Sequence, residues 1–230
     1  MAINVYWACL EESWMLAEEP QSVSSIFNKS YKIDKKEPQS FINYCPAFNN
    51  NLKNVFALRS VYDYSFKIIG NDVVTDRYDQ TFFDEHVTIR SLDKKFFSFR
   101  HKFIFFTDEP SLQVVFYEFP FLEDNNITER CIIPAGSYDI GQWFRNTEFS
   151  FFLKKQYEEF IIEKGEIYSY IRFKTNEKIN FSQFRYTEKL NEYNRDGFAL
   201  TKNPLHSIQK YYKNFKNKKL ILKEIKENLI

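Results

Sequence analysis

Glycine is scarce in this chain, which has 5 glycines among 230 residues. A Walker loop and a dinucleotide-binding fingerprint both need several glycines within one short segment, so neither nucleotide-binding motif can be assembled. Cysteine is also scarce, because Cys9, Cys45 and Cys131 stand far apart and form no C-x-x-C pair. This spacing gives no support to a structural zinc site or a disulfide framework, and it favours reduced thiols in a cytoplasm.

Long apolar runs are missing as well. No segment approaches the ~20 consecutive apolar residues that are needed to cross a bilayer. The start of the chain, from Met1 to Leu10, has no basic residue and leads directly into Glu11 and Glu12, unlike a secretory signal. The sequence therefore predicts a soluble protein that has no membrane partner.

Aromatic residues are abundant instead, with 26 Phe and 15 Tyr, and aromatic side chains favour strands. Strand-like runs follow one another at the spacing of roughly 8–12 residues that is typical of sandwiches and barrels. They cover 3–10, 82–90, 96–106, 112–119, 130–133, 148–153, 159–163 and 166–174. The segment 67–74, with Gly70-Asn71-Asp72 inside it, predicts a hairpin with a tight turn. We predict a mainly β fold, an antiparallel β-sandwich or cupin-like jelly roll, in one domain of residues 1–200 whose segment 11–54 is loop-rich.

Residues 201–230 differ from this body. They hold 8 Lys and 2 Glu, a net charge of +6, whereas the first 200 residues hold 24 basic and 29 acidic residues, a net charge of −5. Asn203 and Pro204 can begin a helix. Apolar residues then recur at helical spacing, first as Leu205, Ile208, Tyr212 and Phe215 and later, on a rotated face, as Leu222, Ile225 and Leu229. We predict a basic helical tail, bent or divided into two short helices, that packs on the β domain.

Three histidines are available for imidazole chemistry. The best metal-ligating set is Asp84, His86 and His101, because non-haem iron sites use two His and one carboxylate and residues two apart on a strand share a face. A plainer interpretation is that Asp84 and His86 meet solvent, while His101 alternates in phase with phenylalanines and lies in the core. Iron or another divalent metal is therefore expected only under an alternative hypothesis, and no other cofactor is predicted.

The segment from Pro134 to Asp139 resembles the Pro-x-Gly-x-x-His stretch of the second cupin motif, with Asp139 in place of the metal-binding His. The first cupin motif, His-x-His, corresponds to Asp84-x-His86. The resemblance implies a β-sandwich and, under the alternative, a cupin-like metal-dependent oxygenase. Pro-x-Gly turns are also common in antiparallel proteins, which favours the structural interpretation.

Two further sets of residues could bind partners. Nucleic acid could be held through phosphates and stacked bases by the tail lysines, which have aromatic residues between them, although a lysine-rich outer face is also ordinary for a solvated helix. These lysines are Lys210, Lys213, Lys216, Lys218, Lys219 and Lys223. Trp143, Phe144 and Arg145 have residue types that are enriched in protein-binding hot spots, and Trp143 fits a core position equally well.

Three segments carry a resemblance to a known family. They are 6–12 (YWACLEE), 105–112 (FFTDEPSL) and 139–145 (DIGQWFR). They are similar to an uncharacterised family of hypothetical proteins from marine T4-like phages, those of cyanophages and pelagiphages. The resemblance implies a phage origin and a place in the host cytoplasm or the virion, and it implies no activity and no site residues.

No complete catalytic constellation is present in the sequence. There is no Gly-x-Ser-x-Gly elbow, and no cysteine stands in a recognisable reactive context. The leading hypothesis is therefore a non-enzymatic phage protein that binds a protein partner of the virion or of the host. The alternatives are a cupin-like oxygenase and nucleic-acid binding through the tail, and each hypothesis is compatible with an oligomer.

Overall fold

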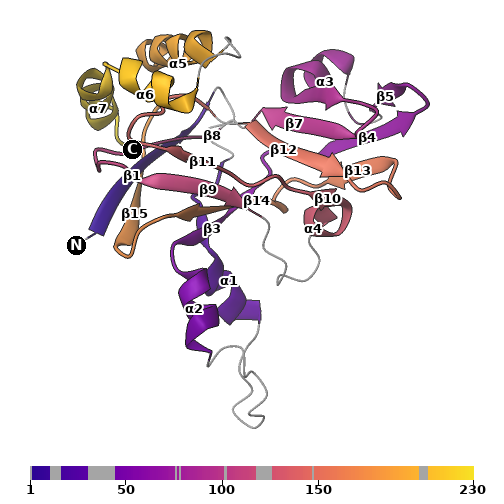
Figure 1. Ribbon diagram of the computed structural model, residues 1–230, viewed down its shortest axis with the longest axis horizontal. Helices are drawn as coiled ribbons and strands as arrows, with labels where there is room; N and C mark the ends of the chain where they lie inside the picture. Colours follow the sequence, from indigo (N-terminus) through magenta and orange to yellow (C-terminus); the bar gives the residue numbers. More distant parts are fainter. Residues whose placement is uncertain are drawn as a thin grey trace.

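The computed structural model describes residues 2–10, 17–30, 45–75, 77, 79–100, 103–117, 126–146, 148–201 and 207–230. It is mainly β, as predicted. Four sheets are present: sheet A (β15-β1-β8), sheet B (β11-β9-β14-β3-β2), sheet C (β13-β4-β5) and sheet D (β10-β12-β7-β6). Figure 1 shows sheets A and B on one side of the molecule, with α5, α6 and α7, and sheets C and D on the other, with α3 and α4.

The strands are β1 (Ala2–Cys9), β2 (Gln21–Ser22), β3 (Val55–Arg59), β4 (Tyr64–Ile69), β5 (Asp72–Val74), β6 (Val87–Ser91), β7 (Phe96–Arg100), β8 (Phe103–Phe106), β9 (Gln113–Tyr117), β10 (Cys131–Ile132), β11 (Gly136–Asp139), β12 (Glu148–Leu153), β13 (Glu159–Ile162), β14 (Ile167–Phe173) and β15 (Lys178–Gln183). The helices are α1 (Val23–Ser30), α2 (Pro46–Leu52), α3 (Gln80–His86), α4 (Asn126–Arg130), α5 (Glu188–Thr201), α6 (Ile208–Asn214) and α7 (Lys218–Glu227). The strand pairs in the described residues are antiparallel except β1 with β15, which is parallel.

Sheet A is covered on both faces. Along β1, Val5 and Trp7 join a core that includes side chains of sheet B, whereas Tyr6 and Ala8 join a second core that includes Ile221 of α7. Successive side chains of a strand point to opposite faces, so a strand that is buried on both sides must be apolar at consecutive positions. The second half of β1 is buried at consecutive positions and meets this requirement. Because Tyr6 and Ala8 share a core with Ile221, the last helices of the chain pack directly on sheet A.

Sheets C and D pack face to face through phenylalanine rings. Phe160 of β13 is fully buried, and its ring centroid lies 5.2 Å from that of Phe66 in the same sheet. Across the interface it lies 4.9 Å from Phe151 and 5.3 Å from Phe99, both in sheet D. Many of the abundant aromatic residues of the sequence thus form the core between these two sheets.

The segment 82–90, predicted as one strand, is the end of a helix followed by a strand. Asp79 begins α3, because its side chain accepts a hydrogen bond from the backbone N of Phe82 at 2.8 Å and caps the helix. Phe83 and His86 are buried at the spacing of a helix face, and β6 starts at Val87. The strand prediction is therefore wrong as far as His86, where capping and helical burial outweigh the strand preference of aromatic residues.

Other segments also divide differently from the prediction. The run 96–106 forms β7 in sheet D and β8 in sheet A, so that it serves two sheets. Within 11–54 the described elements are β2, α1 and α2, whereas α4 and α5 lie where no helix was expected. The tail forms α6 and α7, separated at 215–217, and its predicted start at Asn203 lies outside the described residues. No helix in the described part of the chain has the length and apolar character of a membrane span.

Candidate functional site

The structure does not bring the predicted metal ligands together. Asp84 lies on the exposed side of α3 and accepts a hydrogen bond from Gln80 Nε2 at 2.8 Å, whereas His86 is buried. Residues two apart on a helix point about 200° away from each other, although on a strand they would share a face. His101 lies outside the described residues, within which no group of three His, Cys, Asp or Glu side chains could hold a metal ion.

His86 packs among aromatic rings. Its ring stacks on that of Phe82 with centroids 3.9 Å apart, and it meets the Tyr62 ring edge-on at 5.3 Å. Its Nδ1 lies 2.8 Å from the backbone oxygen of Phe82, one helical turn earlier. The side chain thus stabilises the end of α3 and its contact with sheet C.

Asp139, the counterpart of the cupin histidine, supports a turn. Its Oδ1 accepts a hydrogen bond from the backbone N of Gly141 at 2.8 Å, and its Oδ2 accepts one from Gln142 Nε2 at 2.7 Å. A Cβ atom at Gly141 would lie 2.8 Å from the backbone oxygen of Glu109, so the turn requires glycine there. Both carboxylate oxygens are engaged inside the turn, which fits the structural interpretation of this segment.

The predicted hot-spot residues 143–145 are packed rather than displayed. Phe144 is fully buried in the core beneath sheet A, where no partner can reach it. Trp143 is half-buried, with ring centroids 5.3 Å from Tyr138 and 4.9 Å from Tyr211. The guanidinium carbon of Arg145 lies 5.0 Å from the centroid of the Trp143 ring. These contacts attach α6 to the loop between β11 and β12.

Two neighbouring tyrosines of α6 fix this loop near both of its ends. The Tyr212 hydroxyl accepts a hydrogen bond from the backbone N of Asp139 at 2.6 Å, and the Tyr211 hydroxyl is hydrogen-bonded to the backbone of Phe144. Burial raises the pKa of Tyr211 to about 12 and also raises the pKa of Tyr212. Both phenols are therefore neutral in the fold at ordinary pH.

An alkaline titration tests this arrangement. The folded chain holds the Tyr211 proton more tightly than the unfolded chain, in which the pKa of a tyrosine is near 10. The contribution of the neutral phenol to the free energy of unfolding is therefore complete below pH ~10 and is lost as the pH rises toward about 12. We expect the free energy of unfolding to fall, relative to that of Tyr211→Phe, by roughly 1.4 kcal/mol between neutral pH and pH ~11. Urea unfolding of both proteins measures it, and an unchanged difference between them would contradict the burial of this phenol.

The tail lysines are mostly exposed. Lys210, Lys213, Lys216, Lys219 and Lys223 are exposed, and Lys218 is half-buried. The aromatic residues between them face the body: Tyr211 is buried, and Phe215 packs on the core that contains Phe106, at a ring distance of 6.0 Å. Base stacking needs accessible ring faces, so the tail offers charge for phosphates without a platform for bases.

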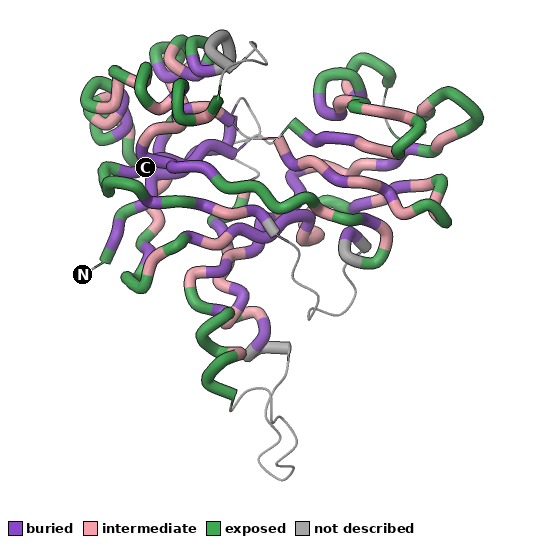
Figure 2. Tube along the Cα trace, in the orientation of Figure 1, coloured by how far each residue is buried: buried purple, intermediate pink, exposed green. Residues whose placement is uncertain are grey.

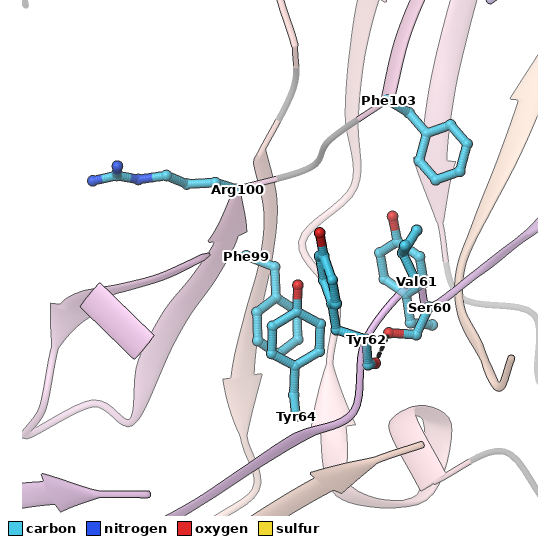
Figure 3. Close-up of a pocket in the computed structure, with 8 residues that line it drawn as sticks. Ser60, Val61, Tyr62, Tyr64, Phe99, Arg100 and Phe103 are labelled. Atoms are coloured by element: carbon cyan, nitrogen blue, oxygen red, sulfur yellow. Dashed lines mark hydrogen bonds between the residues drawn. The ribbon is translucent and has the colours of Figure 1, made fainter. Parts of the chain in front are cut away.

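A pocket lies between the two sides of the molecule. Figure 3 shows Tyr62, Tyr64, Phe99 and Phe103 around it, while Arg100 extends away from these rings. Its volume is about 20 Å³, enough for a single water molecule, whereas small-molecule sites usually enclose roughly 300–1,000 Å³. This pocket is too small for an organic substrate.

A more promising surface is the outer face of sheet D, the face turned away from sheet C. In β12 buried and half-buried residues alternate, as Figure 2 shows, and the buried ones, Phe149, Phe151 and Leu153, point to the core. The other set, with its cross-strand neighbours, forms the outer face. Its members by strand register are Ile132 of β10, Glu148, Ser150 and Phe152 of β12, Phe96, Ser98 and Arg100 of β7, and Thr88 of β6. Arg90 lies at an irregularity of β6 between Ile89 and Ser91, and its side chain joins this face through its contacts with Glu148 and Ser98.

One end of the outer face is apolar. The rings of Phe96 and Phe152, on neighbouring strands, stack with centroids 4.3 Å apart and planes 12° apart. Ile132 stands opposite Phe152 in the sheet and is 54% exposed. Three apolar side chains, one exposed and two half-buried, thus stand side by side at this end of the sheet.

The other end is polar and is held by hydrogen bonds. Arg90 forms an ion pair with Glu148 and donates from Nε to Ser98 Oγ at 3.2 Å, and the Ser98 and Ser150 hydroxyls lie 2.9 Å apart. Ser98 is fully buried among these side chains, so the solvent-facing part of this end consists of the larger side chains around it. Arg100 is exposed, and within the described residues it makes no ion pair; its Nε donates to Thr88 Oγ1 at 3.4 Å. One guanidinium of the outer face is therefore available to a partner.

Similarity to known proteins gives no indication of what this surface binds. Comparison with protein-family models, with curated proteins and with solved structures finds no match. The function is therefore inferred from the geometry of the outer face.

Sequence reasoning missed the outer face, although the sequence holds a signal for it. A strand that is covered on one side alternates apolar and polar residues, and an adjacent pair of aromatic residues breaks that alternation. Such pairs occur at Phe96-Phe97 in β7 and at Phe151-Phe152 in β12. Each pair places one ring in the core and one ring on the outer face.

Proposed function

We propose that this protein is a non-enzymatic binding protein that recognises another protein through the outer face of sheet D. The observation that carries the proposal is the group of exposed Ile132 and half-buried Phe96 and Phe152 beside the arginines of the same face. Aromatic residues and arginine are enriched at protein interfaces and in hot spots, and contiguous exposed apolar surface marks interaction sites.

The outer face is also rigid enough to bind with little loss of entropy. Its serines and Arg90 are linked by hydrogen bonds, and beneath it lies the fully packed phenylalanine core between sheets C and D. A surface that is already ordered in the free protein loses less conformational freedom on association. This supports a preformed recognition surface.

Photo-crosslinking in the cells that make the protein tests the proposal. A photoreactive amino acid replaces Phe152 in one variant and Ile69 in a matched control; Ile69 lies on β4 of sheet C and is 61% exposed. We expect an adduct of defined mass with a second polypeptide from position 152 and none from position 69. Because a carboxylate at Ile132 would disrupt the apolar end, Ile132→Asp is expected to abolish that adduct.

Two results would refute this site. The first is equal crosslinking from both positions, which would indicate random collisions. The second is an adduct at position 152 that survives Ile132→Asp, since the apolar end would then contribute nothing. Thermal unfolding of each variant, compared with the unmodified protein, verifies that the fold is intact.

Finer predictions from the sequence belong to the same proposal. A jelly-roll strand order, a phage origin and a place in the virion or the host cytoplasm all remain predictions. The face-to-face packing of sheets C and D supports the sandwich element of this view. The β1–β15 parallel pair is an addition that an entirely antiparallel sandwich does not contain.

A further inference from the structure

The charges of the outer face are unequal. Two arginines, Arg90 and Arg100, and one glutamate, Glu148, give it a net charge of +1. Because Glu148 is already paired with Arg90, the excess charge resides on Arg100. A charged group at a docking surface selects a partner of opposite sign and repels one of the same sign.

A third arginine lies close to this end. The guanidinium carbon of Arg145 lies 5.0 Å from the centroid of the Trp143 ring, and burial lowers the pKa of this arginine. The loop of Arg145 leads directly into β12, where Glu148 starts the strand. Arg145 therefore adds a positive charge to the segment that enters the polar end of the outer face.

The stacked phenylalanines favour the same kind of partner. One face of each ring is covered by the other ring at 4.3 Å, and the opposite faces are turned toward the flanking strands, where Ile132 stands opposite Phe152 and Ser91 opposite Phe96. The rings therefore present their edges to the solvent. The edge of an aromatic ring carries partial positive charge, which favours a partner with carboxylates nearby, and its C–H groups pack against apolar side chains. Nucleic-acid bases instead stack on open ring faces, so the geometry favours a peptide over a single-stranded nucleic acid.

We infer that the outer face of sheet D takes an extended acidic segment of another protein, with an apolar side chain of that segment on Phe96, Phe152 and Ile132 and a carboxylate on Arg100. The inference rests on the proposed function. Phe96 and Arg100 are four residues apart on β7, which corresponds to about 14 Å. A segment that runs along β7 then has its acidic residue four positions from its apolar residue.

Selection from a library of random dodecapeptides displayed on a carrier tests the inference. We expect the enriched peptides to be acidic, with the four-residue spacing. Fluorescence anisotropy of one enriched peptide should show an affinity that weakens with added salt and falls about tenfold or more with Arg100→Glu. The matched control is Lys219→Glu on α7, an equal change of charge at an exposed lysine, which should leave the affinity unchanged.

The possible failures are distinguishable. Peptides that lose affinity with Phe152→Ala but are not acidic and tolerate Arg100→Glu would overturn the inference and leave the proposed function standing. An absence of peptides that respond to either variant would overturn both. The inference and the proposed function would both be overturned if oligothymidylate bound the wild-type protein, displaced the peptide and lost affinity with Arg100→Glu. That result would indicate a nucleic-acid site. Sensitivity to Lys219→Glu instead of Arg100→Glu would place the site on the tail.

Discussion

Replacement of Phe160 by alanine is expected to lower the free energy of unfolding by about 3–5 kcal/mol. Its ring is fully buried and contacts Phe66, Phe99 and Phe151, so truncation leaves a cavity between two sheets that cannot close without moving both. Small domains have a total stability of about 5–15 kcal/mol, so the loss would be a large part of it. Urea unfolding followed by circular dichroism measures the change.

The matched control is Phe152→Ala, which removes the same side-chain atoms from β12, on the outer face of sheet D. Phe152 is half-buried, and it stacks mainly on Phe96. We expect a loss of about 1 kcal/mol, from one stacked pair and little cavity. Equal losses from the two variants would mean that the outer face is packed as tightly as the core, which would contradict its role as a free surface.

Strands with regular alternation could be predicted from the sequence, because their pattern depends on one covered face. β12 has the predicted bounds, 148–153, and the hairpin of β4 and β5 turns at Gly70, whose φ of +62° is the left-handed conformation that favours glycine. β1 was found through its apolar run. In these elements the local pattern and the tertiary environment agree.

Helices whose buried face is not apolar could not be predicted in this way. In α5 the buried positions include Leu190, Asn194 and Gly197, so the helical stripe holds one apolar residue out of these three. Asn194 is buried because its Oδ1 accepts a hydrogen bond from the backbone N of Asn146 at 3.2 Å, a contact 48 residues away in the chain. Periodicity of hydrophobic residues cannot reveal a face that is made of amide and glycine.

The candidate metal set depended on the same local assignment. Asp84 and His86 share a face only if the segment is a strand, and the cap at Asp79 makes it a helix, in which one side chain is exposed and the other is buried. The sequence signal for this cap is an Asp three residues before the apolar pair Phe82-Phe83, which is typical of a helix start. The outer face of sheet D, by contrast, depends on which strands pair, and no local pattern gives that pairing.

The aromatic residues of the chain thus have two roles in one sheet. In sheet D, Phe97, Phe99, Phe149 and Phe151 form the core, while Phe96 and Phe152 stand on the opposite face. Composition alone cannot separate these roles, because both sets have the same residue type. Strand parity separates them, since side chains two apart share a face and adjacent side chains do not.

Replacement of Ile221 by aspartate is expected to detach α7 from sheet A. Ile221 is fully buried in the core that also contains Tyr6 and Phe106, so an aspartate there would be a buried charge without a built partner. The free energy of burying this aspartate exceeds the roughly 2–5 kcal/mol that an Ile→Ala truncation costs. The helix can avoid that cost by leaving the sheet, because the aspartate then reaches water.

Leu220→Asp is the matched control for this prediction, because Leu220 is the preceding residue of the same helix and is 54% exposed. A surface substitution of this kind changes stability by about 0.5 kcal/mol or less. Hydrogen exchange should therefore show lost protection in α7 for Ile221→Asp and retained protection for Leu220→Asp. Because the backbone N of Arg185, just after β15, donates to the backbone oxygen of Asn228 at 2.9 Å, the Arg185 amide should also lose protection in the first variant. Retained protection in both variants would mean that the tail does not depend on this core.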